Sequence, residues 1–237
     1  MCDECGCEEE EGKEKNVLVN ESVMDENDKI ASKVHHELMH KKVLPINIMG
    51  SPGSGKTTFI QQIARLIGAE EIAVIQGDLE SDIDKEKLEK EGIYTKQINT
   101  HSGCHLNAEM IKKSVEEMDL EDKKFLLIEN VGNLVCPADI KIGQELNVVI
   151  SSTTEGSDKP AKYPVIFQNA DLVVVTKFDI AEHVDFNLKE YEMFLQKIKP
   201  MEIIKASIKD EDGFRKSAEF LKKKYDNWVE KTKTHKH

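Results

Sequence analysis

Short apolar runs alternate with amphipathic stretches along most of the chain, and this pattern predicts alternating strands and helices. Continuous runs of β-branched residues and leucine are typical of strands buried on both faces of a parallel sheet. The expected strands cover residues 46–49, 72–75, 125–128, 148–151, 172–175 and 203–206. The expected helices cover residues 25–42, 56–67, 106–118, 187–199 and 214–230. The sequence therefore predicts an α/β fold with a mostly parallel central sheet of about seven strands, flanked by helices.

Three parts of different composition follow one another along the chain. Residues 1–20 contain three cysteines and an acidic run, and we expect a flexible metal-binding tail. Residues 21–230 form the expected α/β domain, and the Lys/His-rich residues 231–237 are expected to be disordered. No apolar run approaches the roughly 18 residues that span a bilayer, and the start of the chain lacks the pattern of a signal peptide. We therefore expect a cytoplasmic protein without a membrane partner.

Charge and cysteine content narrow the possible partners. Lysine and arginine total 33 against 45 aspartates and glutamates, which gives a net charge of −12. A chain this acidic is a poor ligand for a phosphate backbone, so no nucleic-acid partner is expected. Three of the five cysteines lie within the first seven residues. An odd, clustered set indicates metal or redox chemistry rather than a disulfide framework.

A glycine-rich motif follows the first expected strand. Residues 50–57 read GSPGSGKT and fit the pattern G-x-x-x-x-G-K-[ST] between a strand and an amphipathic helix. Glycines let backbone N–H groups surround phosphate oxygens, and the helix N-terminus adds positive potential. Lys56 is expected to reach the β- and γ-phosphates, and the Thr57 hydroxyl to bind Mg²⁺. The nucleotide-binding residues expected here are Gly50, Gly53, Ser54, Gly55, Lys56, Thr57 and Thr58.

Two acidic residues at strand ends are candidates for the Mg²⁺ site. Asp78 follows the second expected strand, and Glu129 follows the third. Carboxylates at the C-terminal ends of parallel strands face the ligand crevice, so either could hold Mg²⁺ or polarise the attacking water. The expected catalytic residues are Lys56, Thr57, Asp78 and Glu129. Asp82 and Asp84 are expected to lie in a solvated turn.

A second motif predicts which base is recognised. Thr176, Lys177 and Asp179 stand in the sequence TKFD directly after an apolar strand, and this matches the [NT]KxD pattern of GTPases. The aspartate of that motif accepts two hydrogen bonds from guanine. Adenine offers no such donor pair, so an unpaired carboxylate would reject it. Residues 207–209 resemble the loop that supports the base in such proteins.

Two cysteines and a histidine within the domain indicate a transition-metal site. Cys104 and His105 are adjacent, and Cys136 comes seven residues after Glu129. Thiolate and imidazole ligands suit Ni²⁺, Zn²⁺ or copper. Two buried free cysteines and a surface histidine would be the alternative. Because the segment from Glu129 to Cys136 should sense the γ-phosphate, a metal there could be coupled to hydrolysis.

The N-terminal tail provides a second possible metal site. Cys2, Cys5 and Cys7 place three thiols within six residues, enough to chelate one Ni²⁺ ion, although incidental thiols on an exposed tail are the alternative. His36 and His40 are spaced for one helix face, where a solvated polar surface is the favoured interpretation.

Several longer motifs occur in a fixed order and give the chain a resemblance to a known family. They read CxxCGC, GSPGSGKTT, NTHSGCHLNAEMI, IENVGNLVCPAD, TEGSDKPAKYP and TKFD. Together they resemble the HypB family, the SIMIBI-class P-loop GTPases that take part in nickel insertion into [NiFe]-hydrogenase. The similarity runs from about residue 30 to 225, in addition to the cysteine tail.

This resemblance implies an activity, cofactors and partners. The family hydrolyses GTP with Mg²⁺, forms a homodimer in its GTP form, and delivers nickel together with a HypA-type metallochaperone to the hydrogenase large subunit precursor. Cys104, His105 and Cys136 match its metal site at the dimer interface, and Cys2, Cys5 and Cys7 match a nickel motif of some members. No catalytic glutamine is evident, so low intrinsic turnover is expected. A P-loop kinase of a small metabolite and a nucleotide-independent metal-binding module remain the alternatives.

Overall fold

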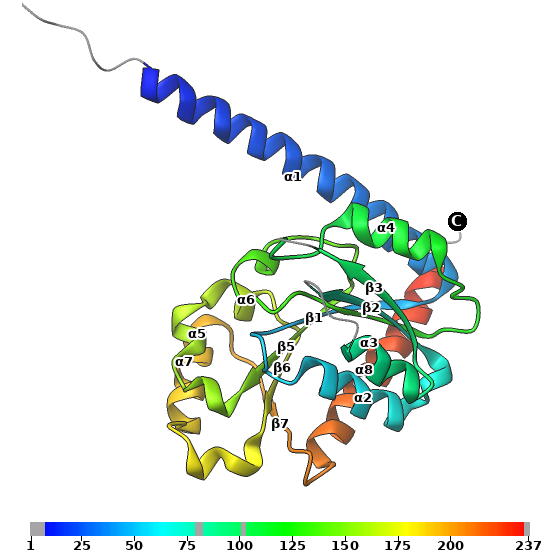
Figure 1. The fold of residues 1–237 in the computed structure, drawn as a ribbon, viewed down its shortest axis with the longest axis vertical. Coiled ribbons are helices and arrows are strands. Elements are labelled where there is room, and N and C mark those ends of the chain that lie inside the picture. The colour runs from blue at the N-terminus through cyan, green and yellow to red at the C-terminus, as the bar shows by residue number, and fades with distance from the viewer. Residues whose placement is uncertain (1–7, 79–82, 101–102, 235–237) are drawn as a thin grey trace, which may run out of the picture.

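Seven parallel strands form the centre of the protein (Figure 1). The computed structural model describes residues 8–78, 83–100 and 103–234. The strands are β1 (Leu44–Met49), β2 (Ile72–Asp78), β3 (Tyr94–Asn99), β4 (Phe125–Glu129), β5 (Leu146–Ser152), β6 (Leu172–Thr176) and β7 (Ile203–Lys205). Their order in the sheet is β3-β2-β4-β1-β5-β6-β7, and every pairing between them is parallel. The predicted fold class is confirmed.

The central strands form from continuous runs of apolar residues. All residues of β1, β4 and β6 are buried, as expected for strands covered by helices on both faces. Each of the six predicted strands is present. The seventh strand, β3, was not predicted, because its sequence YTKQIN is largely polar and partly exposed at the edge of the sheet.

Helices cover both faces of the sheet. They are α1 (Glu8–Lys41), α2 (Lys56–Ile67), α3 (Ile83–Lys90), α4 (Ala108–Glu117), α5 (Lys159–Lys162), α6 (Pro164–Gln168), α7 (Leu188–Ile198) and α8 (Asp212–Thr234). Short 3₁₀ turns lie at η1 (Ala69–Glu71), η2 (Cys136–Ala138), η3 (Thr153–Glu155) and η4 (Phe178–His183). Apolar side chains of α2, α3 and α8 pack on one face, and those of α1, α4, α6 and α7 pack on the other.

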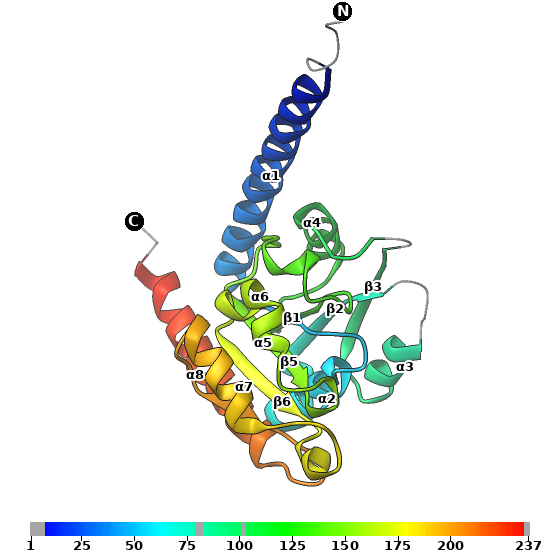
Figure 2. The same ribbon diagram turned by 90° about the vertical axis from the view of Figure 1, so that its left-hand side faces the viewer.

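The two end helices extend further than the sequence pattern indicated. Helix α1 begins at Glu8 instead of near residue 25, and its first half projects from the body of the protein (Figures 1 and 2). The glutamates and lysines at its start are good helix formers, so an acidic composition does not oppose a helix there. Helix α8 continues to Thr234, because Trp228 is 1% exposed and Lys231 lies 2.7 Å from Glu145. Along the described chain, no helix has both the length and the apolar character that crossing a membrane requires.

Candidate functional site

The phosphate-binding motif forms a tight loop between β1 and α2. A Cβ atom on Gly50 would lie 2.3 Å from the carbonyl oxygen of Ile150, so only glycine fits at that point. Gly55 has φ of +98°, in the left-handed region that favours glycine, and directly precedes the first residue of α2. The loop therefore directs the N-terminus of a 12-residue helix toward the adjoining cavity.

Lys56 lies inside this loop. Its ammonium donates to the carbonyl oxygens of Gly50, at 3.3 Å, and of Ser51, at 3.1 Å, and the residue is only 8% exposed. The adjoining cavity of about 470 Å³ is lined by Lys56 and Thr57, and by Glu129 across from them. A cavity of this size is in the range that holds small ligands. A cation fixed at its base is suited to bind phosphate oxygens.

Thr57 and Glu129, which both line the cavity, are joined by a hydrogen bond. The Thr57 hydroxyl donates to Oε1 of Glu129 at 2.8 Å, and Gln76 donates to its Oε2 at 3.0 Å. Burial raises the pKa of Glu129, while the charge of Lys56 and these two hydrogen bonds act in the opposite direction. A hydroxyl next to a carboxylate is the oxygen donor set that Mg²⁺ prefers. The side chain of Asp78, at the end of β2, lies outside the described part of the chain, as does Asp82.

Asp84 was misassigned from the sequence. It lies in the first turn of α3, where Oδ2 accepts from the Thr57 hydroxyl at 3.4 Å and Oδ1 lies 2.6 Å from Lys87. Asp84 therefore lines the nucleotide cavity, whereas the sequence indicated that it would lie in a solvated turn. The sequence offered little signal, because α3 is short and polar and was not predicted. Gln76 was also missed, since nothing local distinguishes a glutamine within an apolar strand.

The TKFD motif lies beside the phosphate loop. The Thr176 hydroxyl donates to the carbonyl oxygen of Ser54 at 2.5 Å, and the Lys177 ammonium donates to that of Gly53 at 2.8 Å. Asp179 lies in η4 with Oδ2 3.3 Å from Lys209. Hydrogen bonds from Ser207 and Lys209 lower the pKa of Asp179, which keeps its carboxylate ionised and able to accept. The structure thus brings the 207–209 loop against Asp179, as the sequence indicated.

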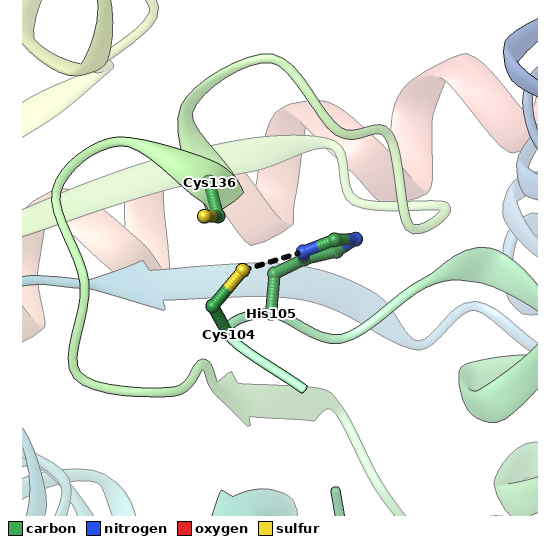
Figure 3. Close-up of side chains that lie close together, drawn as sticks. All are labelled: Cys104, His105 and Cys136. Carbon is green, nitrogen blue, oxygen red and sulfur yellow. Dashed lines mark hydrogen bonds between the residues drawn. The ribbon is translucent and has the colours of Figure 1, made fainter. Parts of the chain in front are cut away.

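Cys104, His105 and Cys136 lie together although two loops supply them (Figure 3). Their ligand atoms all lie within 4.8 Å of one another, and Cys104 Sγ is 3.5 Å from His105 Nδ1. We call these three residues the metal trio. Within the described chain, no other group of three metal-ligating side chains comes this close.

The chemistry of the metal trio suits a soft divalent ion. Burial lowers the pKa of His105, which keeps its imidazole neutral and free to coordinate. A hydrogen bond with Cys136 and burial raise the pKa of Cys104, so a metal ion would displace a proton to bind there. Three ligands leave the fourth position of a tetrahedral site open.

The segment that carries Cys136 rests on the phosphate loop. Asn133 forms an antiparallel bridge with Gly50, and a Cβ on Gly132 would come within 2.8 Å of Pro52. The side chain of Asn133 also accepts from the backbone N–H of Val135 at 2.8 Å and of Cys136 at 3.4 Å. The predicted proximity of this segment to the phosphate site is therefore seen in its contacts.

Of the other candidate transition-metal ligands in the sequence, only His36 and His40 belong to the described residues. Cys2, Cys5 and Cys7 lie outside the described residues. His36 and His40 belong to no cluster of three close ligands within the part of the chain that the structure covers. Their neighbour His35 instead lies 3.0 Å from Glu145 and packs edge-on against Trp228.

Similarity to known proteins extends over most of the chain. The profile of the family described as CobW/HypB/UreG, nucleotide-binding domain, matches residues 44–205. The hydrogenase/urease maturation factor HypB of Helicobacter pylori is 37% identical over 220 residues, which cover 90% of both chains. The chain belongs to the HypB family. The resemblance drawn from the motifs is confirmed, and with it the P-loop GTPase fold.

Solved HypB structures have the same arrangement. The crystal structure of HypB from Helicobacter pylori in complex with nickel superposes with a TM-score of 0.81 at 37% identity, covering 85% of this chain and 96% of that one. The hydrogenase maturation factor HypB of Azotobacter chroococcum is 36% identical over 199 residues, or 83% of this chain. This chain spans 65% of the length of that relative, which is therefore the longer protein.

Proposed function

We propose that this HypB-family protein is a GTP-hydrolysing nickel chaperone of [NiFe]-hydrogenase maturation. One observation carries the proposal: the segment 129–136 begins with a carboxylate bonded to Thr57 and ends with a thiol of the metal trio. One continuous stretch of backbone thus belongs to both the nucleotide site and the metal site. A change at the phosphates must act on the position of Cys136.

The nucleotide roles follow from the cavity. Lys56 neutralises the β- and γ-phosphates, Thr57 and Glu129 hold Mg²⁺ together with Asp78, and Asp179 accepts from guanine. The buried carboxylate of Glu129, bonded to Thr57 and Gln76, supports this assignment because it is already oriented before any ion arrives. When bound, Mg²⁺ would neutralise charge on the transferred phosphoryl group.

Low intrinsic turnover is part of the proposal. Among the described residues that line the cavity there are two glutamines, and both already have partners. Gln76 donates to Glu129, and Gln61 donates to Glu91 at 2.9 Å. Both side-chain amide nitrogens are therefore engaged by carboxylates, which supports low intrinsic turnover. We expect a slow GTPase that dimerisation or a partner protein accelerates.

The metal trio fits Ni²⁺ as cargo, and it fits Zn²⁺ as well. Three ligands per chain favour a homodimer in which a second copy or water completes the coordination. Val135, next to Cys136, is 64% exposed and offers apolar surface at this position. We propose that GTP and metal promote this dimer, and that a HypA-type metallochaperone and the hydrogenase large subunit precursor are its partners. The tail thiols Cys2, Cys5 and Cys7 would form a separate nickel site.

Three measurements on the full chain test this function. Hydrolysis of GTP and of ATP is measured with Mg²⁺ and no acceptor, nucleotide binding by calorimetry, and Ni²⁺ binding from the thiolate absorption band. The proposal requires GTP hydrolysis, weaker activity on ATP, and Ni²⁺ bound in both the tail and the domain. Preference for ATP with turnover only after a small acceptor is added would indicate a kinase. Metal binding without nucleotide binding would indicate a metal-binding module.

A further inference from the structure

A line of hydrogen-bonded asparagines runs across the neighbouring strands β1 and β5 of the sheet. Asn130 donates to Asn47 Oδ1 at 3.1 Å, Asn47 donates to Asn147 Oδ1 at 3.1 Å, and Asn147 donates to the carbonyl oxygen of Asn169 at 3.2 Å. Strand register places Asn47 directly beside Asn147 on β1 and β5. We call these four residues the asparagine line. Every amide donates in the same direction, an arrangement in which the bonds reinforce one another.

Each end of the asparagine line holds one of the loops that form the metal trio. At one end, Asn130 Oδ1 accepts from the backbone N–H of Leu106, the residue after His105, at 3.1 Å. At the other end, Asn169 donates to the carbonyl oxygen of Ala138, in η2, at 2.9 Å. The spacing between the two loops is therefore set by side chains that are not themselves ligands.

Burial makes the Asn130–Asn47 half of this line costly to break. Asn47 and Asn130 are 0% and 1% exposed, and they lie between two apolar clusters on one face of the sheet. A buried amide that loses its partner costs free energy, so such groups persist where their bonds are satisfied. The line divides the apolar layer that covers this face, where aliphatic side chains would otherwise be expected.

Asn130 also connects the nucleotide site to the loop that carries Cys104 and His105. It follows Glu129, whose carboxylate accepts from Thr57, and its own side-chain oxygen Oδ1 accepts from the backbone N–H of Leu106. A movement of Glu129 therefore reaches His105 through one side chain and one hydrogen bond. The route to Cys136 along the backbone needs seven residues. Asn130 thus connects the nucleotide site to the opposite loop of the metal trio.

We propose that Asn130 is a positioning residue that transmits the nucleotide state to the Cys104–His105 half of the metal trio, an inference that rests on the proposed function. Occupation of the Mg²⁺–phosphate site fixes Glu129 and hence Asn130. Asn130 in turn fixes the backbone at Leu106 and the reach of His105 toward Cys136. Ni²⁺ then binds more tightly in the GTP state, and linkage requires that it strengthen GTP binding by the same factor.

The test compares Ni²⁺ affinity in two nucleotide states. The full chain with Cys2, Cys5 and Cys7 changed to alanine limits the thiolate signal to the metal trio. Affinity for Ni²⁺ alone is measured with Mg²⁺ and a non-hydrolysable GTP analogue, and again with Mg²⁺ and GDP. The ratio of the two affinities is the readout, and a ratio of about 5–150 is ordinary for coupled sites. A change that only loosens the fold lowers both affinities and leaves their ratio in place.

Three variants test whether Asn130 transmits the nucleotide state to the metal trio or only stabilises the fold. Asn130→Ala removes the acceptor at Leu106 and should bring the ratio to within about twofold of one, far below the ordinary coupling range. Asn130→Asp keeps an oxygen at Leu106, takes up a proton because the site is buried, and should restore most of the ratio. Asn107→Ala is the matched control. Asn107 lies two residues beyond His105, and its side chain accepts from the N–H of Met110 at 3.0 Å. Its removal should leave the ratio unchanged.

Each outcome has one meaning. The inference is overturned if Asn130→Ala keeps the wild-type ratio, or if Asn107→Ala lowers it equally. It is also overturned if the wild type binds Ni²⁺ equally in both states, a result that would remove the coupling from the proposed function while leaving GTP hydrolysis and Ni²⁺ binding in place. Failure of the wild type to bind Ni²⁺ at the metal trio would remove the proposed function itself. If Asn130→Ala does not fold, Asn47→Ser takes its place and should bring the ratio toward one from the ordinary range of about 5–150, because it removes the acceptor that holds the Asn130 amide.

Discussion

Lys56 and Glu129 on the nucleotide side are 8% and 6% exposed, whereas Cys104 on the metal side is exposed and its two partners are half-buried. On the nucleotide side, one contiguous loop holds Lys56 in place through its backbone carbonyls. The metal side joins two distant loops through asparagine side chains. The first site is formed before its ligand arrives, while the geometry of the second can be adjusted.

This difference in construction suits the two sites to different functions. A preorganised loop loses little conformational entropy on binding, so it can hold nucleotide tightly in either state. A site whose ligands come from separate loops changes affinity when one loop shifts, which is what delivery of a metal ion requires. Uneven local stability of this kind is typical of elements that move in function.

The largest expected effect comes from breaking the nucleotide side. Lys56→Ala removes the buried cation at the loop, and GTP turnover should fall by about 10²–10³-fold, as when a preorganised charge-stabilising group is lost. Ni²⁺ binding at the metal trio without nucleotide should persist. Lys87→Ala is the control, because Lys87 lines the same cavity but is paired with Asp84. Equal losses in both variants would contradict the assignment.

Loss of a ligand from the metal trio should leave nucleotide binding intact. Cys136→Ala should weaken Ni²⁺ binding at the metal trio by at least about 10–100-fold, the cost already seen for outer-shell partners. It should also abolish metal-promoted dimerisation in sedimentation experiments, while Mg·GTP binding persists. Met193→Ala changes an exposed apolar residue of α7 without removing a ligand, and it is the control. Dimerisation by Ni²⁺ that persists in Cys136→Ala would place the shared site elsewhere.

Base recognition tests whether the preorganised side also selects its ligand. Asp179→Asn should weaken GTP binding by about 1.5–3 kcal/mol for each charge-assisted hydrogen bond lost. Xanthosine triphosphate, which carries an acceptor where guanine carries a donor, should bind the variant better than the wild type. Asp210→Asn, in the neighbouring loop, is the matched control. Unchanged GTP affinity in Asp179→Asn would rule out Asp179 as the group that reads the base.

The smallest expected effect lies outside both sites, where Glu145 joins His35 of α1 to Lys231 of α8. Hydrogen bonds from His35 and Lys231 lower the pKa of Glu145. The stabilisation is therefore present above the ordinary value near 4.5 and is lost as pH falls through the lower folded value. Glu145→Gln should lower the free energy of unfolding by about 1 kcal/mol near pH 7.

The pH dependence of that loss provides its check. Denaturant unfolding of wild type and variant should converge as pH falls through the lowered folded pKa of Glu145, because below it the carboxylate is protonated in both states of the wild type. Glu37→Gln, which breaks an exposed pair with Lys41 on the same helix, should change little at any pH. A difference between Glu145→Gln and wild type that stays constant with pH would exclude the charge as its origin.

Contiguous motifs made the nucleotide side readable from sequence. GSPGSGKT and TKFD each carry their chemistry within a few adjacent residues, and the strands before them are continuously apolar. Helix α2 was predicted with its observed bounds for the same reason. The edge strand β3 and the short helix α3 were missed because a strand or helix with little buried surface has no strong apolar period.

Groups that depend on several distant segments could not be read in advance. Asp84 reaches Thr57 only because α3 lies against α2, and the sequence around it resembles any polar turn. The asparagine line joins residues from β1, β5 and two loops, each of which looks ordinary alone. The metal trio was anticipated from its residue types, whereas the asparagines that space its two loops became visible only in three dimensions.

The central place of β1 has a consequence for how the chain is made. Its neighbours β4 and β5 are both later in sequence, and Phe125 is synthesised 125 − 49 = 76 residues after Met49. Because synthesis proceeds at about 5–20 residues per second, roughly 4–15 s pass between the synthesis of β1 and that of its first partner strand. An apolar strand with unpaired hydrogen-bonding groups is a template for association with other chains. The nascent chain is thus the form most exposed to aggregation, and slower translation of residues 50–124 would lengthen that exposure.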